Sequence, residues 1–151
     1  MLQKLLKYPK RIVLVVLLVA LLALVRAFEE ILFYDPLLQY FKNDYQSQPF
    51  PDVDKVNLFL NLLFRYFLNT ILSLAIIQVI FIDMRLTKFA SILYVVFFIL
   101  LAAIFFSIIT FRDQPDTLFI FYVRRFLIQP IFLLLFIPAF FYQQNQKRES
   151  A

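Results

Sequence analysis

The stretch "FIFYVRRFLIQPIFLLLFIPAFFY", Phe119 to Tyr142, indicates the fold class of this chain. It is long and apolar enough to cross a membrane as a helix, because about 20 such residues span the hydrocarbon core. Pro130 and Pro138 are expected to kink that helix. Two consecutive arginines, Arg124 and Arg125, lie inside it. Because charge at this depth is costly against lipid, the arginines are expected to belong to a charged layer shared with other helices.

The composition is that of an integral membrane protein. Of the 151 residues, 63% are hydrophobic and 21 are Phe, whereas a soluble domain is roughly 45–50% apolar. The chain has no Cys, His or Gly, so thiol nucleophiles, imidazole bases, disulfides and Gly-rich phosphate loops are excluded. No catalytic residue, metal ligand or cofactor is predicted, and the net charge of +5 is read as membrane topology rather than nucleic-acid binding.

Four apolar segments predict an all-α, polytopic membrane protein with a single domain over residues 1–151. Each segment is long enough to cross a core of about 30 Å as a helix. An uncleaved first span is favoured over a signal peptide, because a polytopic chain follows it. The expected spans are 12–32, 57–82, 89–111 and 117–142, with an outside loop over 33–56.

Loop charges predict the orientation of these spans. The N-terminal segment, the turn 83–88 and the tail after Tyr142 carry more Lys and Arg than Asp and Glu. The loop 33–56 and the turn 112–116 are rich in Asp. Basic loops stay on the cytoplasmic side, so both termini are expected in the cytoplasm.

The outside loop is predicted to contain a short helix. Asp35 is expected to cap it with its side chain, and Pro36 suits the first helical position. The segment "PLLQYFK", 36–42, has an apolar face, so we expect the helix to lie on the outer membrane surface. The residues of that face are Leu37, Leu38, Tyr40 and Phe41.

Arginines and carboxylates from three spans are expected at a similar depth. At 1.5 Å per residue, Arg65 lies roughly 12 Å along the second span, and Arg124 lies roughly 10 Å along the fourth. The polar residues near the outer end of the first span lie within about 9 Å of that end. The predicted polar layer comprises Arg26, Glu29, Glu30, Asn61, Arg65, Asn69, Arg124, Arg125 and Gln129.

Helical spacing assigns faces within this layer. Asn61, Arg65 and Asn69 recur every four residues, which places them on one stripe. Tyr122, Arg125 and Gln129 form a second stripe, and both stripes are expected to face the bundle interior.

In this reading Arg125 points inward and meets Glu29 or Glu30. Arg124 points about 100° away and reaches the outer headgroups or a partner. The alternative is that Arg26 pairs with Glu29 and Glu30 on its own helix. A purely structural layer and a binding layer both remain open.

Three stretches resemble the exosortase F system-associated membrane protein family. They are "FYDPLL" (33–38), "FRYFLNTILSLAII" (64–77) and "RRFLIQPIFLLLFIPAFFYQ" (124–143). The resemblance implies a small multi-pass protein of the bacterial inner (cytoplasmic) membrane that accompanies an exosortase, a transpeptidase-like sorting enzyme. The family has no assigned catalytic residues, and exosortases use a Cys, an Arg and a His, so this chain is not expected to be that enzyme.

The leading hypothesis is therefore a non-catalytic accessory protein. It would bind exosortase or its substrates through the outer-leaflet polar layer, with membrane lipid and a second copy of itself as further expected partners. The alternative is a small transporter or flippase-like protein for an anionic lipid or glycan carrier, in which Arg65, Arg124 and Arg125 hold the phosphate. A minor third reading is acid–base catalysis by Glu29, Glu30 or Asp35.

Overall fold

The fold is all-helical, as the sequence predicts. The structure is a computed structural model and describes residues 8–33, 35–43, 51–111, 116–129 and 131–149. Over these ranges the chain forms helices and no strand. The helices are α2 (Pro9–Ala27), α3 (Glu29–Leu32), α4 (Pro36–Lys42), α5 (Lys55–Phe81), α6 (Met84–Phe111), α7 (Thr117–Ile128) and α8 (Ile131–Glu149).

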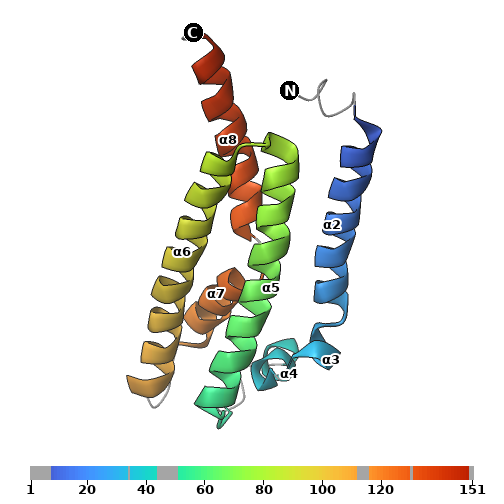
Figure 1. The fold of residues 1–151 in the computed structure, drawn as a ribbon. Helices are drawn as coiled ribbons and strands as arrows, with labels where there is room; N and C mark the ends of the chain where they lie inside the picture. Colours follow the sequence, from blue (N-terminus) through green and yellow to red (C-terminus); the bar gives the residue numbers. More distant parts are fainter. Residues whose placement is uncertain (1–7, 34, 44–50, 112–115, 130, 150–151) are drawn as a thin grey trace.

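The two longest helices, α5 and α6, form an antiparallel pair at the centre of the fold (Figure 1). α2 packs on α5, and α7 packs on α6 and α5. α2 begins, and α8 ends, at the same end of the bundle as the turn between α5 and α6 (Figure 1). The short helices α3 and α4 lie toward the opposite end, where they are placed to cover the part of α5 that carries Arg65.

Local signals explain where α5 begins and ends. The side chain of Asp54 accepts hydrogen bonds from the backbone N–H groups of Val56 and Asn57, which caps the first turn. At the other end Ile82 has left-handed backbone angles, φ 52° and ψ 35°. A β-branched residue disfavours this conformation, but it closes the helix with a bond from its N–H to the Gln78 carbonyl, 2.9 Å long.

Length and apolar character identify candidate membrane spans among the helices. α5 and α6 are each long and apolar enough to cross a membrane. α7 and α8 together make a third such segment if the pair is counted as one broken span, with 61° between the two helices. α2, with Lys10, Arg11 and Arg26 among its 19 residues, is not among these candidates.

The expected first span, 12–32, is not one continuous helix. α2 begins earlier, at Pro9, and ends at Ala27. Phe28 leaves helical geometry with φ −100° and ψ 18°, and α3 then makes a single turn. The break turns Glu29 into the protein, where it is buried.

The proline predictions for the last span have separate outcomes. Pro130 lies outside the described residues, and the helices on either side of it meet at 61°. Pro138 lies inside α8, and the kink expected there stays a prediction.

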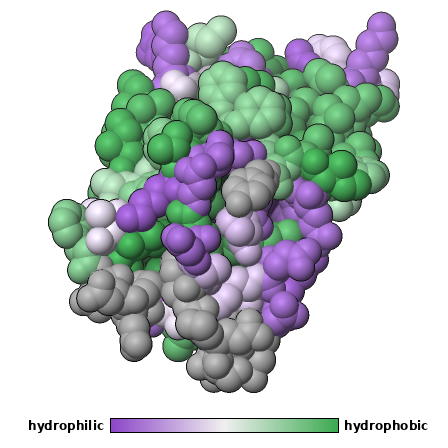
Figure 2. All heavy atoms as spheres, turned by 90° about the horizontal axis from the view of Figure 1, so that it is seen from below, coloured by the Kyte–Doolittle hydropathy of each residue, from purple (hydrophilic) through white to green (hydrophobic). Residues whose placement is uncertain are grey.

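The short helix α4 exists, but its environment differs from the prediction. It begins at Pro36, as expected, yet Leu37, Leu38 and Tyr40 on its apolar face are buried within the protein. Phe41 packs edge-on against Phe121 of α7, with ring centroids 5.3 Å apart. The apolar face therefore covers the bundle instead of entering lipid. Hydrophilic side chains gather on this end of the molecule, flanked by apolar surface (Figure 2).

Leu37→Ala should destabilise the protein, because Leu37 is 0% exposed and a cavity would remain. Burial of this kind predicts a loss of about 2–5 kcal/mol in the free energy of unfolding. The measurement is unfolding in detergent, monitored by the circular dichroism signal of the helices. Ile31→Ala is the control, since Ile31 is 82% exposed and its truncation should change stability little. Equal effects of the two substitutions would contradict the packed position of α4.

Candidate functional site: a buried arginine and carboxylate network

Glu29 is the first of two acids that bind arginines inside the bundle. Its Oε2 atom accepts a hydrogen bond from Arg26 Nη1, 2.7 Å away, across the break between α2 and α3. The same oxygen accepts from Nη2 of Arg65 on α5. Glu29 therefore joins the first helix to the central one. Of the two pairs expected for Arg26, the one with Glu29 forms, whereas Glu30 pairs with Lys42, and the Arg65 pair crosses helices.

Asp35 is the second acid, and its role differs from the predicted one. It occupies the position before α4, but its side chain makes no capping hydrogen bond. Oδ2 instead accepts from Nη2 of Arg124 on α7, and Arg65 Nη1 lies 3.8 Å from the same oxygen. An ion pair with arginine is stronger than a bond to a neutral backbone N–H, which explains why the carboxylate turns inward.

Arg65 lies between the two acids and connects them. The network runs from Arg26 through Glu29, Arg65 and Asp35 to Arg124, and so links α2, α3, α5, α7 and the start of α4. The Arg65 side chain is 2% exposed, and those of Asp35 and Arg124 are 4% and 5% exposed.

Aromatic rings complete the surroundings of the two buried arginines. The guanidinium of Arg65 lies 5.4 Å from the centre of the Phe33 ring, and that of Arg124 lies 5.7 Å from the Phe41 ring. Contact with a ring face favours a cation that has lost its water. Both rings come from the segment around α4, so this segment supplies the aromatic contacts as well as the acid Asp35.

The prediction for the two adjacent arginines was wrong. Arg124 faces the interior and meets Asp35, whereas Arg125 is exposed and donates from Nε to Gln129 Oε1, 3.1 Å away. Apolar residues of α7 decide this face, because Ile120, Val123 and Leu127 are buried at helical spacing with Arg124. That pattern is visible in the sequence, but the prediction followed the polar stripe through Tyr122, which is 55% exposed.

The three residues of the stripe predicted on the second span have different surroundings. Arg65 and Asn69 are buried, and Asn69 donates from Nδ2 to the carbonyl of Ile128, 3.0 Å away. That carbonyl belongs to the last residue of α7 and would otherwise lack a helical partner. Asn61 is half-buried and donates to the Asn57 carbonyl of its own helix.

Glu30 takes no part in the buried network. It forms an ion pair with Lys42 at the end of α4, and both side chains are about half exposed. A surface pair of this kind contributes roughly 0–1 kcal/mol. It ties α3 to α4 from outside.

The chemistry open to the network is charge neutralisation and helix linkage. Within the described ranges no group of three His, Cys, Asp or Glu residues is placed to hold a metal ion. Glu29 and Asp35 each accept hydrogen bonds from arginines of the chain itself. The transporter hypothesis assigned Arg65, Arg124 and Arg125 to a phosphate. Arg65 and Arg124 form ion pairs with acids of the chain itself, and Arg125 donates to Gln129.

Comparison with known proteins adds no relative. The chain matches no protein-family profile, no curated protein and no solved structure.

Adjacent substitutions should distinguish the two arginines of α7. Arg124→Gln leaves Asp35 buried beside a weaker partner, and removing one member of a buried pair typically costs about 3–5 kcal/mol. Arg125→Gln removes an exposed cation and should cost less than about 1 kcal/mol. Unfolding of both variants in the same detergent measures the difference. A larger effect at Arg125 would overturn the assigned facing of α7.

The ion pair itself can be tested by removing both charges. Asp35→Asn in the Arg124→Gln background should recover part of the lost stability, because no uncompensated carboxylate remains at this point. A double variant whose loss equals the sum of the two single losses would show that the two side chains do not interact.

Proposed function

We propose that this chain is a non-catalytic accessory membrane protein of a bacterial exosortase sorting system. In this proposal it is multi-pass in the inner (cytoplasmic) membrane, with four spans and both termini in the cytoplasm. The resemblance in three stretches supports the system, and the loop charges support the orientation. The common end at which α2 begins and α8 ends agrees with an even number of crossings (Figure 1).

One observation carries the proposed mode of action, namely the exposed face of α7. Arg125 is exposed, and no acid among the described residues pairs with it. Phe119 and Tyr122 are 48% and 55% exposed, and they lie about 120° and about 60° around the helix from Arg125, so the three side chains share one third of its circumference. Arginine and aromatic side chains are enriched at the centres of protein interfaces.

The polar layer thus separates into an internal part and an external part. Arg65 and Arg124 neutralise buried acids, so they stabilise the fold. Arg125 lies outside this pairing, and an acidic side chain of a partner would compensate its charge within the membrane. We therefore assign binding of exosortase to the α7 face that contains Phe119, Tyr122 and Arg125.

A tagged pull-down from gently solubilised native membranes tests this proposal. Exosortase should be recovered in a stoichiometric amount, and Arg125→Gln should lower that recovery about tenfold, as expected when one charge-assisted hydrogen bond is lost. Lys42→Gln is the matched control, because it removes an exposed cation near the same end without touching α7. Recovery of the chain without exosortase, or equal recovery with both variants, would refute the proposal.

Single cysteines should report the orientation, because the chain contains none of its own. Ser47→Cys, in the outside loop, should react with a membrane-impermeant thiol reagent in spheroplasts. Ser150→Cys, in the tail, should react only after the inner membrane is opened. The reverse pattern, or reaction of both in intact spheroplasts, would exclude four spans with cytoplasmic termini.

A further inference from the structure

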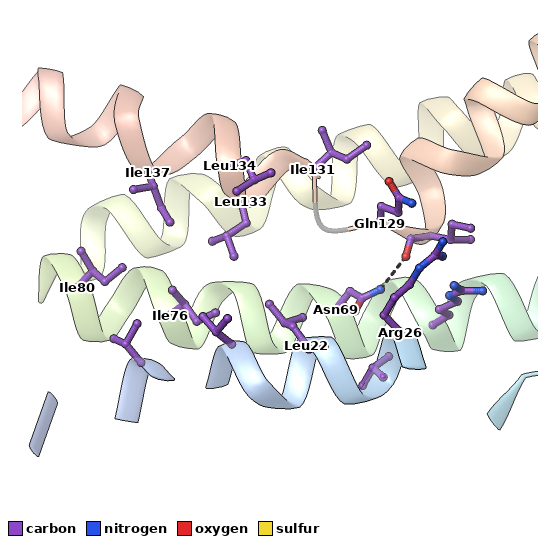
Figure 3. A pocket seen from close by; sticks show the side chains of 16 residues that line it. Leu22, Arg26, Asn69, Ile76, Ile80, Gln129, Ile131, Leu133, Leu134 and Ile137 are labelled. Carbon is purple, nitrogen blue, oxygen red and sulfur yellow. Dashed lines mark hydrogen bonds between the residues drawn. The ribbon is translucent and has the colours of Figure 1, made fainter. Parts of the chain in front are cut away.

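A cavity of about 490 Å³ lies between α2, α5 and the α7–α8 region, beside the buried network. Its volume falls within the range of about 300–1,000 Å³ that is usual for small-molecule sites. Polar groups line one end, where Arg26, Asn69 and Gln129 lie, and apolar side chains such as Leu22, Ile76 and Ile137 line the rest (Figure 3). The cavity therefore has a polar end and an apolar end, like an amphiphile.

The polar end has a surplus of positive charge. The ion-pair network beside this end contains three arginines, Arg26, Arg65 and Arg124, and two carboxylates, Glu29 and Asp35. One positive charge thus remains uncompensated in the network, at a depth where water screens charge poorly.

Arg65 also has hydrogen-bonding capacity left over. It lines the cavity and is 2% exposed, yet neither its Nε nor its Nη1 donates a hydrogen bond to any described group. Arg26 reaches from α2 toward the end of the cavity that holds Gln129, and its side chain is 49% exposed (Figure 3). Glu29 Oε2 already accepts from Arg26 Nη1 and Arg65 Nη2, so an anion in the cavity would use the remaining donors of these two guanidinium groups.

The apolar part of the cavity has the length of a lipid chain. From Asn69, at the polar end, to Ile80 it follows α5 for roughly 16 Å, at 1.5 Å per residue. One leaflet contributes about half of the 30 Å hydrocarbon core. A free phosphate ion would use the polar end alone, whereas a lipid would fill both ends.

We propose that this cavity binds one phospholipid with an anionic headgroup, its phosphate at Arg26 and Arg65 and an acyl chain along α5 and α8. Arginine suits phosphate because its planar guanidinium donates two parallel hydrogen bonds. The proposed lipid site lies between helices of the folded protein. It does not depend on exosortase binding, because the proposed partner face of α7 uses other side chains.

Native mass spectrometry of the full chain, released from nanodiscs of equal phosphatidylglycerol and phosphatidylcholine, tests the assignment. One phosphatidylglycerol should be retained in preference to phosphatidylcholine. Arg26→Gln should lower that preference about tenfold, the loss expected for one charge-assisted bond. Lys42→Gln, which removes a cation that does not line the cavity, should leave it unchanged. Equal retention of the two lipids, or no effect of Arg26→Gln, would overturn the proposal.

The acyl-chain part has its own pair of variants on α2. Ala23→Phe would fill the cavity, which Ala23 lines, and should reduce lipid retention at least fivefold. Ala20→Phe adds the same ring at a position of α2 that does not line the cavity, and it should leave lipid retention unchanged. Both alanines are exposed on the surface of the helix bundle, so neither change disturbs the protein core. Loss with both variants, or with neither, would refute the acyl-chain assignment.

A thermal-shift measurement in neutral detergent separates a lipid site from an anion site. Phosphatidylglycerol should raise the unfolding temperature, because a ligand bound only by the folded state stabilises that state. Inorganic phosphate at the same concentration should not. An equal rise with phosphate would reduce the site to an adventitious ion site, and no rise with the lipid would overturn it.

Discussion

The position of Arg65 between Glu29 and Asp35 is the constraint on which this structure depends. A guanidinium that is 2% exposed cannot keep its water, so the fold must bring acids to it. One acid comes from the break after α2 and the other from the start of α4, and the second acid also takes Arg124 from α7. The charged groups therefore determine how the helices meet, although apolar contacts fill most of the interior.

This constraint also explains the irregular parts of the chain. A straight first helix would carry Glu29 past Arg65, and the break at Phe28 turns its carboxylate inward. α4 covers the network with Leu37 and Leu38, while Phe33 and Phe41 lie against the two buried arginines. Phe33 and α4 thus cover the ion pairs of Arg65 and Arg124 and shield them from water.

The same network leaves charge over, and this surplus connects the two proposals. Arginines exceed the acids that hold them, because Arg26, at the cavity, shares Glu29 with Arg65, and Arg125, at the outer face of α7, has no acid among the described residues. In a low-dielectric region excess positive charge favours an anion nearby. A lipid phosphate would balance the charge near Arg26, and an acidic side chain of a protein partner would balance the charge of Arg125.

The sequence by itself determined the all-helical class, the approximate extent of the long helices and the buried polar stripe on α5, because apolar length and helical spacing are local properties. It also contained the signal for Arg124, in the spacing of Ile120, Val123 and Leu127. Only the tertiary structure decided that the Asp35 side chain binds arginine instead of capping α4. It also decided that α4 turns its apolar face into the bundle, and which acid meets which arginine. These outcomes depend on partners distant in the sequence, where an ion pair formed away from water outweighs a local backbone hydrogen bond.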